Sequence, residues 1–177
     1  MVIGSDKLLA LVREKGLIKN LSKRELVNPE GPGFDLRLGA VYSIAGEGFL
    51  GCKERQTPSP LLVAQYKKEK TIVLKPGDYY LAATIEEVNI PKNIFAHVFS
   101  RTTLFRSGVQ LIAGKVSPGY YGKLVFGLAN LGPARMEIEL GARFAFIVFH
   151  ELSGFSNSSR GQWKGGRIAA EKKELQV

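Results

Sequence analysis

The chain is poor in the residues that form metal centres and covalent cross-links. Its 177 residues include one cysteine, Cys52, and two histidines, His97 and His150. One cysteine cannot form an internal disulfide or a thiolate zinc cluster, and two histidines are too few for a histidine-rich metal site. We therefore expect no metal bound by protein side chains alone, and a reducing compartment.

Long apolar runs are also missing. Charged residues interrupt the apolar stretch at the N-terminus, MVIGSDKLLALVREKG, and no run approaches the length of a membrane span. The expected protein is soluble and cytoplasmic, without a signal peptide and without membrane contact.

Negative charge is scarce as well. The chain has 25 Lys and Arg against 16 Asp and Glu, a formal net charge of +9. This balance favours anionic partners such as nucleotides, nucleic acid or acidic surfaces. The basic residues are spread along the chain, so a solvated basic surface is the alternative. We do not expect nucleic acid as the partner, because no strand face alternates aromatic and basic residues.

Short strands account for most of the hydrophobic pattern. Apolar and polar residues alternate in FDLRLGAVYSI, and Gly and Pro turns separate further segments such as IFAHVF, KLVFGLAN and RMEIELGARFAFIVFHEL. One helix is expected in residues 5–16, ending at Gly16. Residues 54–70 are interpreted as a loop. The pattern predicts an all-β sandwich or barrel.

The segment from Ser153 onward differs from the rest of the chain. It is polar, rich in glycine and without periodicity, and alone it would be disordered. We therefore divide the chain into a β domain, residues 1–152, and a C-terminal arm, residues 153–177. The arm contains the only tryptophan, Trp163, which indicates that the arm stacks on something.

The first motif with chemical content is SRTTLFRSG. Arg101 and Arg106 flank two hydroxyls, Thr102 and Thr103. Arginine side chains bind phosphate oxygens in pairs, and hydroxyls add neutral donors. If TTLFR forms a short helix, its first N–H groups would also face the anion. The alternative is a surface helix whose arginines bind nothing.

Two further motifs are weaker. In GPGFDLRLG, Asp35 could be catalytic, but we interpret it as a structural residue that ties down a turn or pairs with an arginine. In SSRGQWKGGR, the basic residues Arg160 and Lys164 flank Trp163, so the arm could close over a nucleotide and exclude water. A disordered basic tail is the alternative.

In this order, the segments resemble the dCTP deaminase and dUTPase superfamily, over most of the chain. The resemblance is carried by GPGFDLRLG, KPGDYYLAATIEEVNIPKNIFAHVFSRTTLFRSGV, VSPGYYGKLVFGLANLG, GARFAFIVFHEL and SSRGQWKGG. It implies a distorted jelly-roll-like (dUTPase-like) β fold with a short N-terminal helix and a flexible C-terminal arm. It also implies a homotrimer with active sites between subunits, and a pyrimidine deoxynucleoside triphosphate with Mg²⁺ on its phosphates. Members convert dCTP to dUTP, dUTP to dUMP, or both.

The resemblance also implies roles for individual residues. Arg101, Thr102 and Thr103 would hold the triphosphate, Thr102 would help to place the attacking water, and Arg106 would lie near the base. The turn and the arm would supply the remaining nucleotide contacts, which are Gly119, Tyr120, Arg160, Gln162, Trp163 and Lys164.

Two carboxylates of the family pattern are missing. The dUTPase aspartate of the Asp-Pro-Gly turn corresponds to Ser117, and the deaminase glutamate of the next strand corresponds to Gly127. A serine hydroxyl has too high a pKa to act as a general base at neutral pH, and a nucleophilic Ser117 would need its own base. A relocated acid is the alternative; the candidates are Asp78, Glu86, Glu87 and Glu151.

The segment between Arg106 and Ser117 also departs from the deaminase pattern. It is shorter than in typical deaminases, and QLIAG at residues 110–114 is closer to the dUTPase hairpin that recognises uracil. The preference between cytosine and uracil therefore stays open.

Three functions remain at this point. The first is an enzyme that deaminates dCTP or hydrolyses dUTP. The second is a non-catalytic relative that binds a nucleotide or a partner as a sensor or regulatory subunit. The third, supported only by the net charge, is a nucleic-acid-binding β protein.

Overall fold

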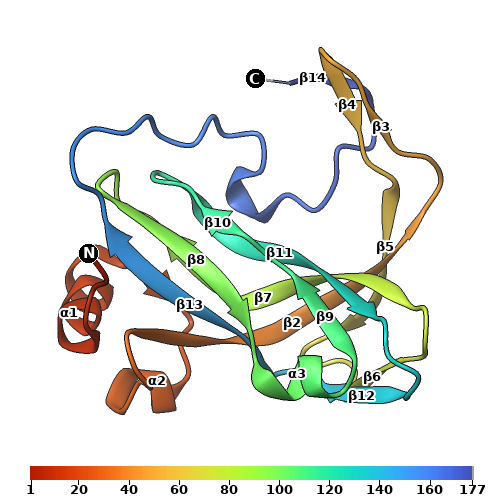
Figure 1. The fold of residues 1–177 in the computed structure, drawn as a ribbon, viewed down its shortest axis with the longest axis horizontal. Helices are drawn as coiled ribbons and strands as arrows, with labels where there is room; N and C mark the ends of the chain where they lie inside the picture. The colour runs from red at the N-terminus through yellow and green to blue at the C-terminus, as the bar shows by residue number, and fades with distance from the viewer. Residues whose placement is uncertain (177) are drawn as a thin grey trace.

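One long strand, β2 (Gly33–Ala45), organises the fold of the computed structural model, which describes residues 1–176. The first part of β2 pairs with β13 (Arg143–Glu151), and the second part pairs with β7 (Tyr79–Asn89) and β5 (Ser59–Gln65). A single antiparallel sheet therefore curls around the core (Figure 1). This confirms the all-β prediction.

The remaining strands extend this sheet or form two small ones. β8 (Ile94–Ser100) and β10 (Lys115–Val116) continue it beyond β13, while β11 (Tyr121–Asn130), β9 (Val109–Ile112) and β1 (Ile18–Lys19) lie on the side of β7. β6 (Thr71–Leu74) pairs with β12 (Met136–Glu139). β3 (Phe49–Leu50), β4 (Glu54–Gln56) and β14 (Glu174–Leu175) form a three-stranded sheet.

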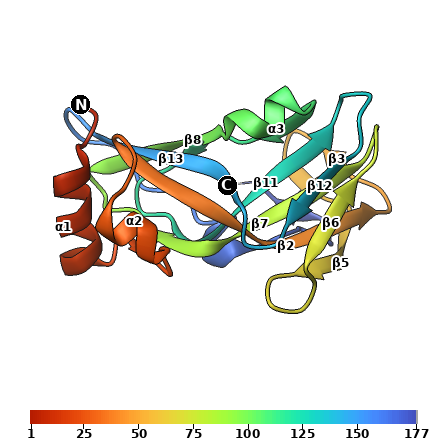
Figure 2. The same ribbon diagram turned by 90° about the horizontal axis from the view of Figure 1, so that it is seen from below.

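The helices are short. They are α1 (Ser5–Lys15), α2 (Lys23–Val27), α3 (Thr102–Arg106) and the 3₁₀ turn η1 (Lys164–Gly166). α1 confirms the helix predicted for residues 5–16, and TTLFR forms the short helix α3 that was considered for it. Figure 2 shows α1 and α2 at one end of the curled sheet and β5 and β6 at the other. No helix in residues 1–176 is both long and apolar enough to cross a membrane.

The loop predicted for residues 54–70 is wrong, because β4 and β5 both lie inside it. These strands were not predicted because two prolines and several polar residues interrupt the apolar pattern of the segment. Pro58 falls between β4 and β5, and Pro60 lies near the start of β5, which is an edge strand where a missing N–H is tolerated.

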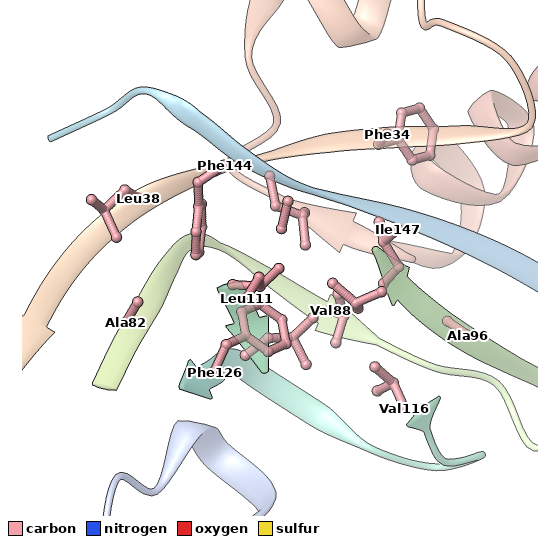
Figure 3. Close-up of a cluster of buried hydrophobic side chains, with 14 of the residues drawn as sticks. Phe34, Leu38, Ala82, Val88, Ala96, Leu111, Val116, Phe126, Phe144 and Ile147 are labelled. Carbon is pink, nitrogen blue, oxygen red and sulfur yellow. The ribbon is translucent and has the colours of Figure 1, made fainter. Parts of the chain in front are cut away.

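The core lies between the two halves of the curled sheet. Figure 3 shows Phe144 and Ile147 of β13 pointing toward Val88 of β7 and Phe126 of β11. Phe34, Phe144 and Ile147 are at most 1% exposed. Burying each such side chain stabilises the fold by about 1.5–3 kcal/mol.

Gly39 allows β2 to pass from one half of the sheet to the other. An added Cβ there would lie 2.8 Å from the backbone atoms of Thr84 and Ile85 on β7. The pairing of β2 with β7 also shifts register between Leu38 and Ala40. Only glycine permits this close approach, which lets the sheet curl into two facing halves.

Candidate functional site

A cavity of about 630 Å³ opens between the open face of β7, β11 and β9 and the C-terminal arm. Its floor comes from β7 and β11, one wall comes from the segment 112–117, and the arm covers it with residues 159–163 and 167–168. Ser117 and Gly127, the positions of the two missing acids, both line it. The cavity is therefore the place where the sequence predicted chemistry.

The cavity wall is basic and rich in hydroxyls. Lys115, Arg160 and Arg167 supply positive charge, and the hydroxyl residues include Ser117 and Tyr79. Among the described residues, none that lines the cavity carries a carboxylate. The Lys115 ammonium lies beside Ser117, and its Nζ donates to Ser117 Oγ at 3.3 Å. This wall suits an anion and offers no side chain that could act as a strong general base.

Tyr79 occupies the space that a side chain at Gly127 would need. A Cβ added to Gly127 would lie 2.6 Å from Tyr79 Oη and 3.1 Å from Ile112 Cβ. In the β ladder, Gly127 lies between Leu81 of β7 and Ile112 of β9. The sheet therefore has a hollow at Gly127, flanked by two aliphatic side chains and bounded by a phenol hydroxyl.

The arm is held against the same protomer by a small cluster of charged and aromatic side chains. Glu174 accepts hydrogen bonds from Arg55 at 2.6 Å and pairs with Arg167 at 2.7 Å. Both arginines also lie over the Trp163 ring, at 4.4 and 5.7 Å from its centroid. The Arg167 and Arg55 guanidinium groups lower the pKa of Glu174. We call Arg55, Trp163, Arg167 and Glu174 the latch.

Backbone pairing supports the latch. Thr57 N–H donates to the Ala170 carbonyl at 2.9 Å, and Ala170 N–H donates to Thr57 Oγ1 at 2.8 Å. Ala170 is completely buried, and β14 pairs with β4. These contacts give order to a segment whose sequence alone shows no periodicity. The stacking partners expected for Trp163 are Arg55 and Arg167 of the latch.

The arginine-hydroxyl segment lies elsewhere in the protomer. Figure 1 places α3 at the opposite end of the molecule from the arm. Thr102, Thr103 and Arg106 are exposed on α3 and do not line the cavity. Within one protomer, the predicted phosphate-binding segment and the predicted chemical centre are therefore separate.

Arg101 pairs with the buried carboxylate of Asp35. Its Nη1 lies 3.0 Å from Asp35 Oδ1, while Arg24 and Arg143 donate to Asp35 Oδ2 at 3.1 and 2.8 Å. The Asp35 side chain has no solvent exposure. The angle of the Arg101 contact departs from that of a good hydrogen bond, so this pairing is electrostatic rather than directional. The structural interpretation of Asp35 is confirmed.

The four candidates for a relocated catalytic acid have other roles in the protomer. Glu86 is fully buried and accepts from the Arg37 backbone N–H at 2.8 Å and from Arg37 Nε at 2.7 Å; burial raises the pKa of Glu86 against these contacts. Asp78 accepts from the Lys75 N–H in a turn, and Glu151 pairs with Lys7. Glu87 lies across from Lys19 and Lys123 in the ladder. None of the four lines the cavity.

The predicted residues thus divide into two groups. Those that line the cavity are Ser117, Tyr120, Gly127, Arg160, Gln162 and Trp163; those outside its lining are Arg101, Thr102, Thr103, Arg106, Gly119 and Lys164. Sequence reasoning missed Tyr79, Lys115 and Arg167. Lys115 lies two residues before Ser117, which was a usable signal, whereas the other two come close to the site only through the fold.

The comparisons with known proteins agree with this architecture. The dCTP deaminase-like family matches residues 2–152. The dCTP deaminase of Natronomonas pharaonis is 32% identical over 143 residues, covering 77% of this chain and 73% of that protein. The dCTP deaminase of Pyrococcus furiosus is 28% identical over 165 residues, covering 92% and 94%.

A solved structure shows the same fold. The 2'-deoxycytidine 5'-triphosphate deaminase from Agrobacterium tumefaciens superposes with a TM-score of 0.64 at 17% identity, over 84% of this chain. This chain spans 47% of that protein's chain. The fold and the matches define a β protein of nucleotide metabolism. The chain belongs to the dCTP deaminase-like family.

Proposed function

We propose that this protein acts in deoxyribonucleotide metabolism by binding a pyrimidine deoxynucleoside triphosphate, dCTP or dUTP, in the cavity beneath the arm. The observation that carries the proposal is the cavity wall, where Lys115, Arg160 and Arg167 supply positive charge and, within residues 1–176, no lining carboxylate opposes it. Guanidinium and ammonium groups are the usual protein ligands of phosphate. The relatives are named as dCTP deaminases, which indicates the same class of ligand.

Magnesium would enter with the triphosphate. In the part of the chain that the structure describes, no three His, Cys, Asp or Glu side chains are grouped to hold a metal ion. The residues therefore fit a Mg²⁺–nucleotide complex better than a resident metal. Arg160 and Lys164 of the arm would approach its phosphates, while Gln162 and Trp163 would cover the ring and Gly119 and Tyr120 would shape the turn beneath it.

A second copy of the chain would complete the site. Thr102, Thr103 and Arg106 lie on α3, outside the cavity of their own protomer. In a homotrimer of the kind that the family resemblance implies, α3 of one subunit would reach the cavity of the next. Arg101 would also reach that cavity, while Arg24 and Arg143 would keep the charge of Asp35 neutralised.

We further propose that the protein binds this ligand without the usual reaction of the family. Attack of water on a cytosine ring or on a phosphate requires a group that accepts the proton of the water. Ser117 and Gly127 provide no such group, and Lys115 beside Ser117 is a cation. Losing a positioned general base costs about 10²–10⁴ in rate, whereas binding contacts survive. Turnover with a carboxylate from a neighbouring subunit is the alternative, which the names of the relatives favour.

The experiment combines a turnover assay with a binding assay. Purified protein is incubated with Mg²⁺ and dCTP or dUTP, products are separated by chromatography, and thermal unfolding is followed with and without nucleotide. Binding without turnover supports the proposal; a ligand at 100 times its Kd stabilises the protein by about 2.7 kcal/mol. The variant Arg106→Ala should weaken this stabilisation.

Other outcomes would identify the other functions. Turnover that Arg106→Ala abolishes would establish the enzyme and overturn the non-catalytic role. No stabilisation by either nucleotide would overturn the binding proposal. Stabilisation by oligonucleotides alone, weakening steeply with salt, would indicate a nucleic-acid-binding protein.

A further inference from the structure

The hollow at Gly127 has the shape and surroundings of a site for a flat ring. Leu81, Gly127 and Ile112 lie side by side on three neighbouring strands, with Gly127 in the middle. Residues directly opposite one another in a ladder point to the same face of a sheet. Because Gly127 has no side chain, the Tyr79 phenol can lie over its backbone, and a planar group placed between the two aliphatic side chains would meet the Tyr79 hydroxyl.

The polar edge of this hollow is the Tyr79 hydroxyl. Its Oη lies 2.6 Å from the position that a Cβ of residue 127 would take, and Tyr79 is 40% exposed and lines the cavity. The other cavity tyrosine, Tyr120, donates its hydroxyl to the Lys123 carbonyl at 2.6 Å. Within residues 1–176, Tyr79 Oη has no comparable protein partner, so it is available to a ligand.

We infer that Tyr79 meets the polar edge of the bound ring and makes this site accept cytosine and uracil alike. This inference rests on the proposed function. A carboxylate only accepts hydrogen bonds, so it favours a ring that presents an amino group. A phenol hydroxyl both donates and accepts, so it can donate to the O4 oxygen of uracil or accept from the N4 amino group of cytosine. Tyr79 is thus a specificity-determining residue, and its effect is that the site accepts either base.

Gly127 and Tyr79 act as a pair in this site. A side chain at residue 127 would displace the hydroxyl, since the Cβ would lie 2.6 Å from Oη, well inside contact distance. If Tyr79 is replaced by Phe, the 2.6 Å contact is removed, and the contacts that remain are Ile112 Cβ at 3.1 Å and ring Cζ at 3.2 Å, so the conflict is reduced. The two positions should therefore be coupled in a double-mutant cycle.

The experiment measures the Kd of the Mg²⁺ complexes of dCTP and dUTP by calorimetry, for the wild type and three variants. The wild type should bind both nucleotides with Kd values within about tenfold of each other. Tyr79→Phe should weaken both by about 2- to 10-fold, the effect of one hydrogen bond. Gly127→Ala should do the same in the wild type, but should change the Kd by a smaller factor when added to Tyr79→Phe.

The control variant is Tyr121→Phe, which removes a hydroxyl from an exposed tyrosine outside the cavity. It should leave both Kd values and the unfolding midpoint unchanged. The midpoint of Tyr79→Phe should also stay at the wild-type value, which separates a binding effect from a folding defect.

The failure of this inference is distinguishable from failure of the proposed function. If the wild type binds nucleotides but Tyr79→Phe changes neither Kd, the inference is overturned and the binding function stands. A preference above tenfold for one base, or full additivity of Gly127→Ala and Tyr79→Phe, would also overturn it. If neither nucleotide binds the wild type, both proposals fail.

Discussion

Replacing Asp35 by asparagine tests whether one buried carboxylate holds together three cationic segments. Asp35 has no exposed side-chain surface, and guanidinium nitrogens of Arg143, Arg101 and Arg24 lie 2.8, 3.0 and 3.1 Å from its oxygens. Asparagine keeps the size of the side chain but removes its charge and points an amide N–H at one of the arginines. The variant therefore leaves three guanidinium groups without their shared counter-ion.

The expected loss follows from burial. Removing one partner of a buried ion pair costs about 3–5 kcal/mol. The three arginine side chains are 30–45% exposed, so they can turn toward water and recover part of this cost. We therefore expect the lower end, about 3 kcal/mol. In a chain of this size that corresponds to a fall of about 6–12 °C in the unfolding midpoint.

The assay is urea unfolding and thermal unfolding at one fixed protomer concentration, because assembly would make the midpoint depend on concentration. The control is Glu30→Gln, since Glu30 is 62% exposed and lies 3.5 and 3.7 Å from Arg24 and Arg101. This variant should lose at most about 1 kcal/mol. If Asp35→Asn were as stable as Glu30→Gln, the reasoning about the buried charge would be refuted.

Three further predictions concern the arm, the sheet face and the cavity. Glu174→Gln should speed amide exchange over residues 170–175 without moving the unfolding midpoint of the β domain, because Glu174 pairs with both Arg55 and Arg167; unchanged exchange would show that the latch is unimportant. Burial, followed by His97 and the N-terminal ammonium, lowers the pKa of His150, so the unfolded state binds more protons below pH 6.5. Stability should therefore fall as the pH drops through this window, and His150→Phe should flatten the slope of midpoint against pH; an unchanged slope would contradict this. Trp163 is the only tryptophan and lines the cavity, so its fluorescence should change on adding Mg²⁺–dUTP, and a signal that survives in Trp163→Phe would disprove the assignment.

Local pattern was sufficient for most elements of the fold. Alternation along β2 and the apolar segments of β8, β11 and β13 predicted strands where the structure has them, because apolar side chains of these strands are buried in the core, on one face or on both. The pattern failed at β4, the middle strand of the small three-stranded sheet, and at β5, an edge strand that contains Pro60. At an edge, pairing with one neighbour supplies the stability that burial does not, and a single sequence does not reveal that neighbour.

In the candidate site, too, some features could be predicted from the sequence and others could not. The two missing acids could be found from the sequence, since Ser117 and Gly127 follow from their positions in one turn and one strand. The residue that takes up the space at Gly127 could not be found from the sequence, because Tyr79 reaches Gly127 only through the pairing of β7 with β11. The order of the arm likewise depends on Arg55 and Thr57, more than 100 residues before their partners in the chain.

The sequence by itself determined that the chain folds mainly into strands, carries excess positive charge and lacks carboxylates at the two expected positions. Each of these properties depends on composition or on residues close together in the chain. Only the tertiary structure decided that the arm lies over the cavity and that Arg101 is held by Asp35. It also decided that a tyrosine fills the space at Gly127, because these contacts join residues that the curled sheet brings together from distant parts of the chain.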